Sequence, residues 1–181
     1  ATPLRSAAQI LRSRSNEFAE LMAIEMGKPL AQGRSEIEKC ALVCEYYADN
    51  AAGFLTSEEI VTEAQKSYIT YRPLGVVFAI MPWNFPFWQV FRFAAPTLIG
   101  GNGALLKHAP NVPGCALAIE RLLAEAGFPE DLFRTLMISV AQTKSVIRPW
   151  HVAAVTLTGS TAAGKAVAKE AGAHLKKCVL E

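Results

Sequence analysis

Apolar residues recur every three or four positions through the first third of the chain, which is the spacing of one buried helix face. A first helix is predicted over residues 4–26, and Gly27 followed by Pro29 is a typical stop signal. A second helix is predicted to begin at residues 35–38, Ser-Glu-Ile-Glu, because this is a capping-box pattern, and to end near Gly53. Neither helix carries a candidate site.

The residue preference changes after the second helix. Residues 58–73 predict a β-hairpin, because β-branched and aromatic residues on both arms flank a polar turn at residues 63–66. By itself the pattern fits an ordinary edge hairpin.

Short apolar runs alternate with helical segments from Gly75 to the end of the chain. Strands are predicted over residues 75–80, 104–107, 132–140 and 152–158, and from residue 178 onward. Helices are predicted over residues 87–99, 111–127 with Asn111 as N-cap, 142–148, and 161 to about 172. This alternation predicts the α/β class, with a Rossmann-like parallel sheet flanked by helices and a protruding hairpin.

The composition narrows the functional classes. Of 181 residues 51% are hydrophobic, and the net charge is only +2 without a basic stripe, which argues against nucleic acid as a partner. No apolar run reaches membrane-spanning length. The three histidines and four cysteines form no metal-ligand pattern, and Cys40 and Cys44 are expected to be reduced core residues, as in a cytoplasmic protein. The chain opens inside a helix and closes where a strand begins, so we expect a portion of a larger protein.

The first candidate site is the loop after the predicted strand 75–80. Pro82 and Pro86 stiffen this loop at the carboxyl end of the strand, where open α/β sheets bind ligands. The amide of Asn84 on such a loop can stabilise an oxyanion. Alternatively, Asn84 only closes a turn as an Asx residue.

A second candidate is Gly-Ser-Thr-x-x-Gly at residues 159–164, between a strand and a helix. Small residues, hydroxyl groups and a helix N-terminus suit a phosphate group. The alternative is a plain strand-to-helix turn with Ser160 or Thr161 as the helix N-cap.

Two cations complete the candidates. Lys107 ends a predicted strand at the same sheet edge as Trp83 and Asn84, where it either reaches ribose hydroxyls or a 2′-phosphate, or is a solvated strand end. Arg92 is the lone cation on an apolar helix, where it either holds a substrate carboxylate or reaches the surface.

These motifs together resemble those of the NAD(P)-dependent aldehyde dehydrogenases. The matching residues are 82–86 (Pro-Trp-Asn-Phe-Pro), 100–102 (Gly-Gly-Asn) with Lys107, and 158–161 (Thr-Gly-Ser-Thr), in the family's order and approximate spacing. The chain is most similar to the succinate-semialdehyde type. The resemblance implies that residues 1–181 are the amino-terminal and cofactor-binding portion, that the catalytic domain is absent, and that the hairpin takes part in subunit contacts of a homo-oligomer, a dimer or tetramer.

The resemblance also implies roles for single residues. Ile80, Pro82, Trp83, Lys107, Gly159 and Ser160 would bind NAD or NADP, and Arg92 would bind the carboxylate of the substrate. NAD-preferring members often place a glutamate where this chain has Pro110, so acceptance of NADP is expected.

The chemistry implied by the resemblance is oxidation of an aldehyde to a carboxylic acid. Asn84 would stabilise the oxyanion and Glu181 would activate water, whereas the nucleophilic cysteine would lie beyond Glu181. Cys178 is expected to be a core residue, facing away from Glu181. Two alternatives remain open: a nucleotide-binding or assembly module without chemistry, and a relative that passes its acyl group to coenzyme A.

Overall fold

The centre of the structure is β3 (Val76–Met81), an apolar strand with a parallel neighbour on each side. In this computed structural model, which describes residues 1–181, the sheet has the order β5-β4-β3-β6-β7 and all its pairs are parallel. The other strands are β4 (Gly103–His108), β5 (Phe133–Thr135), β6 (Val152–Leu157) and β7 (Lys177–Leu180). The predicted α/β class and parallel sheet are therefore confirmed.

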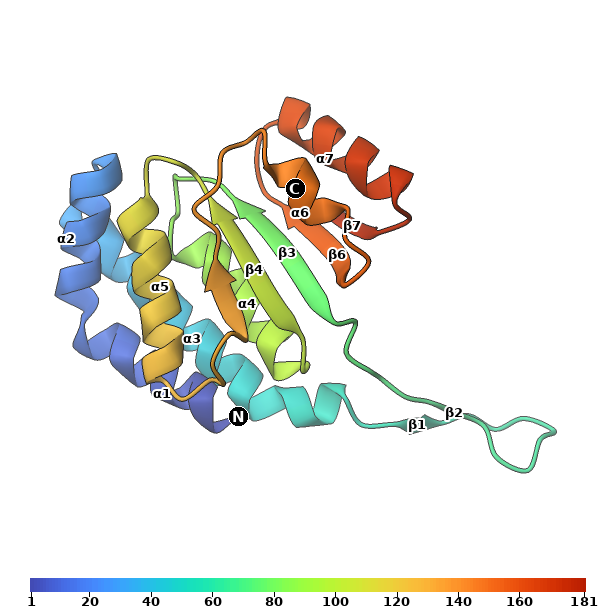
Figure 1. Ribbon diagram of the computed structural model, residues 1–181. Helices are drawn as coiled ribbons and strands as arrows, with labels where there is room; N and C mark the ends of the chain where they lie inside the picture. The colour runs from blue at the N-terminus through green and yellow to red at the C-terminus, as the bar shows by residue number, and fades with distance from the viewer.

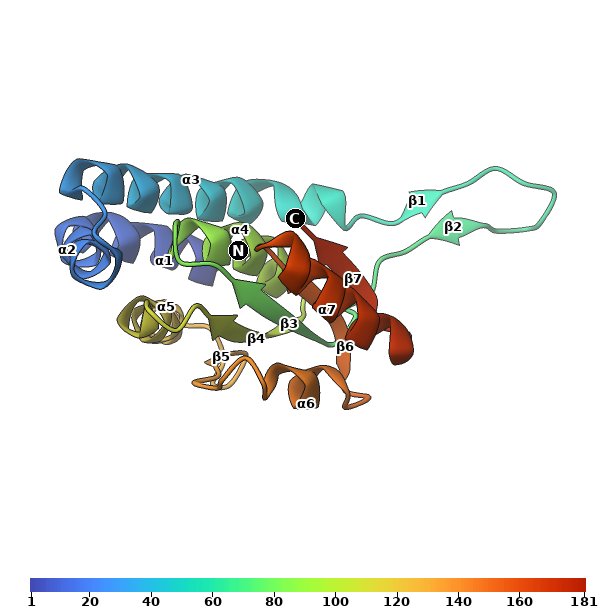
Figure 2. The ribbon, with the colours of Figure 1, turned by 90° about the horizontal axis from the view of Figure 1, so that it is seen from above.

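Helices cover both faces of the sheet (Figure 1, Figure 2). One face carries α1 (Thr2–Ser13), α2 (Ser15–Met26), α3 (Leu30–Phe54), α4 (Trp88–Ile99) and α5 (Pro113–Glu125), and the other carries α6 (Thr143–Ile147) and α7 (Thr161–Ala173). Successive side chains of a strand point to opposite faces. Ala79 and Met81 accordingly belong to the larger core beneath α1 to α5, and Phe78 belongs to the smaller core beneath α6 and α7.

The predicted single helix over residues 4–26 is wrong, because the helix breaks at Arg14. This residue has φ −108° and ψ 20°, and its guanidinium binds Glu17 in α2 and Glu125 in α5. The break falls in a polar run, residues 12–16, in which serine and asparagine compete with helical backbone hydrogen bonds.

Two predicted helix starts are also wrong. The helix α3 begins at Leu30 after Pro29, and Ser35 donates its hydroxyl to the carbonyl of Ala31 instead of capping. The helix α5 begins at Pro113 with Val112, not Asn111, in the N-cap position. In the second case a carboxylate from another helix supplies the cap, since Glu25 accepts the N–H groups of Gly114 (2.6 Å) and Cys115 (2.8 Å).

The predicted strand over residues 132–140 is confirmed only in part. The edge strand β5 pairs with β4 over three residues, 133–135. Farther on, Ser139 bonds locally to Gln142 through both its N–H and its hydroxyl, and these bonds close a turn instead of extending the ladder.

The hairpin is confirmed, although its ladder is short. It consists of β1 (Glu58–Glu59) and β2 (Tyr68–Ile69), which pair antiparallel, and it projects away from the sheet and helices (Figure 1). Its apolar side chains face solvent, and Val61 is 99% exposed. None of the helices is both long and apolar enough to cross a membrane.

The cysteines are all free. Cys40, Cys44 and Cys115 are buried, as predicted for the first two. Cys178 is exposed, so its expected place in the core is wrong. The reason is that β7 lies at the edge of the sheet, and all four of its residues are exposed.

We expect Gly33→Ala to destabilise the protein. A Cβ atom at Gly33 would lie 2.9 Å from Cβ and 3.0 Å from Cα of Ala19 in the neighbouring helix. Such overpacking typically costs about 1–3 kcal/mol, measured as the free energy of unfolding in denaturant.

The matched control is Gly53→Ala in the same helix, where a Cβ atom would meet nothing within 4 Å. Replacing this exposed helical glycine should raise stability by about 0.5–1 kcal/mol. Equal effects at the two positions would contradict close packing of α2 on α3 at Gly33.

Candidate active site

The carboxyl ends of β3, β4 and β6 lie side by side, and this brings the predicted site residues to one edge. Ile80 of β3 is the register partner of Lys107 on one side and of Leu157 on the other. The carbonyl of Ile80 accepts the N–H of Thr158 at 3.1 Å, and the carbonyl of Glu181 accepts the N–H of Gly159 at 2.9 Å. Ligands bind at such an edge in open α/β sheets.

The loop after β3 presents Asn84 to solvent. Trp83 is 50% exposed and Phe85 46%, and Asn84 between them is also exposed. The side chain of Asn84 makes no hydrogen bond, so the alternative that it closes an Asx turn finds no support. Its carboxamide N–H groups are therefore available to an oxygen that develops negative charge.

The start of α7 forms a small pocket on the α6/α7 face of the sheet. The pocket has a volume of about 300 Å³, and its lining includes Gly159, Ser160, Gly164 and Lys165. Ser160 is the N-cap, and its hydroxyl accepts the N–H of Ala163 at 3.3 Å. The capping alternative is thus observed, and the positive end of the helix together with Lys165 also suits an anion.

Lys107 is not a solvated strand end, because it is only 5% exposed. Its ammonium donates to the carbonyl of His108 at 3.0 Å, and burial holds the pKa of Lys107 below its ordinary value. As the register partner of Ile80 it lies on the same face as the α7 pocket. Four of the residues predicted to bind cofactor therefore share one side of the sheet edge, namely Ile80, Lys107, Gly159 and Ser160.

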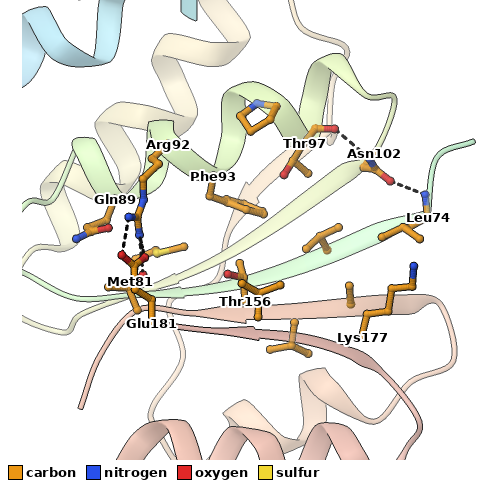
Figure 3. Close-up of a pocket in the computed structure, with 16 residues that line it drawn as sticks. Leu74, Met81, Gln89, Arg92, Phe93, Thr97, Asn102, Thr156, Lys177 and Glu181 are labelled. Atoms are coloured by element: carbon orange, nitrogen blue, oxygen red, sulfur yellow. Dashed lines mark hydrogen bonds and ion pairs between the residues drawn. The ribbon is translucent and has the colours of Figure 1, made fainter. Parts of the chain in front are cut away.

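Arg92 lies on the other side of this edge, in a cavity of about 490 Å³ between α4 and strands β3, β6 and β7 (Figure 3). Its guanidinium holds the carboxylate of Glu181 through both terminal nitrogens, with 2.9 Å between Nη1 and Oε1. It also donates to the hydroxyl of Thr158 at 3.2 Å. The hydrogen bonds from Arg92 hold the pKa of Glu181 below its ordinary value. Both residues were predicted from the sequence, but their contact was not.

Two further residues of this cavity were not predicted as site residues, although Asn102 was recognised as part of the Gly-Gly-Asn motif. Gln89 precedes Arg92 by one helical turn, and its Oε1 is buried without a hydrogen-bond partner. Asn102 accepts the N–H groups of Leu74 (2.6 Å) and Gly75 (3.2 Å), which fixes the entry of the chain into β3. Helical spacing from Arg92 is the only sequence signal that could have identified Gln89.

Polar side chains behind the Asn84 loop were missed as well. Lys28 and Glu36 form a buried ion pair, and His108 is buried at the end of β4. Burial of charge is not visible in a sequence, and the three histidines gave no sequence pattern that would single out His108.

Comparison with known proteins gives a consistent result. The sequence profile of the Aldehyde dehydrogenase family matches residues 1–181. The chain is 53% identical over 178 residues to a probable succinate-semialdehyde dehydrogenase [NADP(+)] of Synechocystis, and 48% identical over 181 residues to a succinate semialdehyde dehydrogenase [NAD(P)+] of Escherichia coli. The two matches cover 98% and 100% of this chain, respectively, but only 39% of each relative.

Solved structures agree with the sequence relatives. Succinic semialdehyde dehydrogenase from Streptococcus pyogenes, solved in complex with NADP+, matches with a TM-score of 0.97 and 40% identity. The match covers 99% of this chain and 40% of that one. The chain therefore spans about two fifths of the proteins that it matches.

Proposed function

The chain belongs to the aldehyde dehydrogenase family, and we propose that it forms the cofactor-binding portion, with part of the substrate site, of an NAD(P)-dependent enzyme that oxidises succinate semialdehyde to the carboxylic acid. The observation that carries this proposal is the contact of Arg92, which binds a carboxylate through both terminal nitrogens inside a cavity beside the Asn84 loop. Succinate semialdehyde has one carboxylate and one aldehyde group, so a site for it needs one cationic end and one reactive end.

The cofactor fits the α7 side of the sheet edge. Ser160 and Gly159 lie at the positive end of α7, where the pyrophosphate of a dinucleotide is stabilised. Lys107, beside Ile80, is the cation for the ribose, and Pro82 and Trp83 begin the loop next to it. When bound, the cofactor supplies the acceptor for hydride from the aldehyde carbon.

The substrate fits the α4 side of the same edge. The carboxylate of Glu181 shows that Arg92 has room for a bidentate partner, and the hydroxyl of Thr158 fixes the guanidinium in place. A substrate carboxylate would take this position, and Glu181 would then be released. Asn84 lies eight residues before Arg92, and its amide is oriented toward solvent for the oxygen of the reacting carbonyl.

The remaining chemistry needs a base and a nucleophile. Glu181, as a carboxylate, accepts a proton from the water that hydrolyses the acyl intermediate. None of the four cysteines suits the role of nucleophile, because a thiolate is required and desolvation by burial raises the pKa of Cys44 to about 12. Burial also raises the pKa of Cys40 and Cys115, and partial desolvation raises the pKa of the exposed Cys178. The nucleophile is therefore assigned to the part of the enzyme beyond Glu181.

The hairpin, residues 58–73, is assigned to contacts between subunits of a homo-oligomer. Its aromatic residues Tyr68 and Tyr71 are 57% and 53% exposed on an arm that projects from the rest of the fold. Exposed apolar groups of this kind typically mark interaction sites.

The substrate assignment predicts the effect of Arg92→Gln in the full-length enzyme. Loss of the charge-assisted bidentate pair should raise KM for succinate semialdehyde by about 10- to 100-fold, since hydrogen bonds to a charged group contribute about 1.5–3 kcal/mol. Steady-state kinetics with an uncharged aldehyde of similar length should show little change in KM.

Arg148→Gln is the matched control, because Arg148 pairs with Glu170 away from the cavity. Arg148→Gln should leave both KM values unchanged. An equal loss for charged and uncharged aldehydes in Arg92→Gln would exclude Arg92 as the carboxylate-binding residue.

The contact between Arg92 and Glu181 predicts a pH effect. Glu181 acts as a base only when ionised, and Arg92 lowers its pKa. In Arg92→Gln the pKa of Glu181 rises, so the acid limb of the kcat profile for an uncharged aldehyde should move to higher pH. Glu181→Gln should abolish the acid limb of the kcat profile. If the acid limb does not move in Arg92→Gln, a group other than Glu181 is responsible for it.

Pro110 predicts the cofactor preference. Pro110→Glu places an acidic group after β4, at the edge assigned to the ribose, where it repels a 2′-phosphate. The ratio of kcat/KM for NADP to that for NAD should fall by about tenfold or more, equivalent to at least 1.4 kcal/mol. Pro129→Glu, an exposed loop proline before β5 at the opposite sheet edge, should leave the ratio unchanged.

A further inference from the structure

Both polar atoms of the Pro86–Phe87 peptide unit are bonded to buried side chains from other elements. The carbonyl oxygen of Pro86 lies 2.9 Å from Nε2 of His108, at the end of β4. The N–H of Phe87 donates to Oε1 of Glu36, in α3, at 2.8 Å. One peptide unit is thus held from opposite sides by two parts of the fold, and it lies at the downstream end of the Asn84 loop.

Glu36 makes further contacts beyond its hydrogen bond with Phe87. Its Oε1 also accepts the N–H of Trp88 at 2.9 Å, so it caps α4 from outside that helix. Its Oε2 pairs with the ammonium of Lys28, and the side chains of Lys28 and Glu36 are only 4% and 2% exposed. The same ammonium lies 3.9 Å from the ring centroid of Phe85, the residue after Asn84. The ion pair therefore contacts the loop both before and after Pro86.

The hydrogen bonds of His108 determine its protonation. Nδ1 of His108 accepts the N–H of Ala109 at 2.9 Å, so the ring proton is on Nε2 and is donated to the carbonyl of Pro86. Burial lowers the pKa of His108 and keeps the imidazole neutral. The bond to Pro86 thus persists at neutral pH.

Pro86 leaves its own ψ angle free, and the contacts with His108 and Glu36 fix it. A proline ring fixes φ but not ψ, so Pro86 does not by itself set the plane of the peptide that follows it. His108 and Glu36 fix that plane by holding its carbonyl and its N–H. Phe87 adds an apolar anchor, since it is fully buried with its ring centroid 5.1 Å from that of Phe18.

We infer that Lys28, Glu36 and His108 are positioning residues, which set the oxyanion donor Asn84 by clamping the Pro86–Phe87 peptide. The inference rests on the proposed function, because it assigns these residues to the reaction in which Asn84 takes part. They contact neither substrate nor cofactor and act through the loop. Displacement of a catalytic group by about 1 Å can reduce the rate by about 100-fold.

The test uses the full-length enzyme and two independent variants. Lys28→Met/Glu36→Leu removes the carboxylate without leaving a buried charge unpaired, and His108→Leu removes the donor to Pro86. In each variant kcat for succinate semialdehyde should fall by about 10- to 100-fold, with the dissociation constant of NADP unchanged within about twofold.

A double-mutant cycle with Asn84→Ala separates positioning from a general structural effect. If the clamp acts through Asn84, its variants should lower kcat by less than about threefold in the Asn84→Ala background. Glu25→Leu is the matched control, because Glu25 caps α5 through two N–H groups in the way that Glu36 caps α4. Its effect on kcat should be below about threefold in both backgrounds.

Each outcome decides between the two proposals. If Asn84→Ala retains the wild-type kcat, the oxyanion assignment in the proposed function fails, and this inference fails with it. Suppose instead that Asn84→Ala lowers kcat. The clamp alone is then refuted if Lys28→Met/Glu36→Leu and His108→Leu leave kcat unchanged, or if each adds its full effect to that of Asn84→Ala. Should Lys28→Met/Glu36→Leu not fold, His108→Leu decides the question by the same cycle.

Discussion

The parallel pairing of β3 with β4 and β6 is the constraint on which the site depends. Parallel strands that start together also end together, so the segments after Met81, His108 and Leu157 meet at one edge although they are far apart in the chain. The central position of β3 follows from its uninterrupted apolar sequence, which suits burial on both faces. A change of register in this strand would displace the Asn84 loop relative to Lys107 and the start of α7.

The edge has two sides that differ in chemistry, because strand side chains alternate. Lys107 and the start of α7 lie on one side, and the cavity with Arg92 lies on the other. Glu181 borders both, since it lines the cavity as well as the pocket at α7. This arrangement suits the proposed hydride transfer, in which a small substrate and a large cofactor would approach from opposite sides.

The sequence predicted the strands well and the helix starts poorly, for a physical reason. Apolar runs and glycine clusters are local signals, and they correctly located β3, β4 and β6. The start of α5 depends on Glu25, which is 89 residues away from Gly114. The contact between Arg92 and Glu181 joins residues equally distant in sequence. Contacts that depend on tertiary folding cannot be read from spacing, and they account for the features that were missed at the site.

The hairpin of β1 and β2 adds little to either hydrophobic core. Its sequence is therefore free to change without altering the packing that places Asn84 and Arg92. Under the role proposed for this arm in subunit contacts, substitutions on it would alter which surfaces associate without changing the chemistry at the sheet edge. Under that proposed role, quaternary structure and catalytic specificity would be free to diverge independently during evolution.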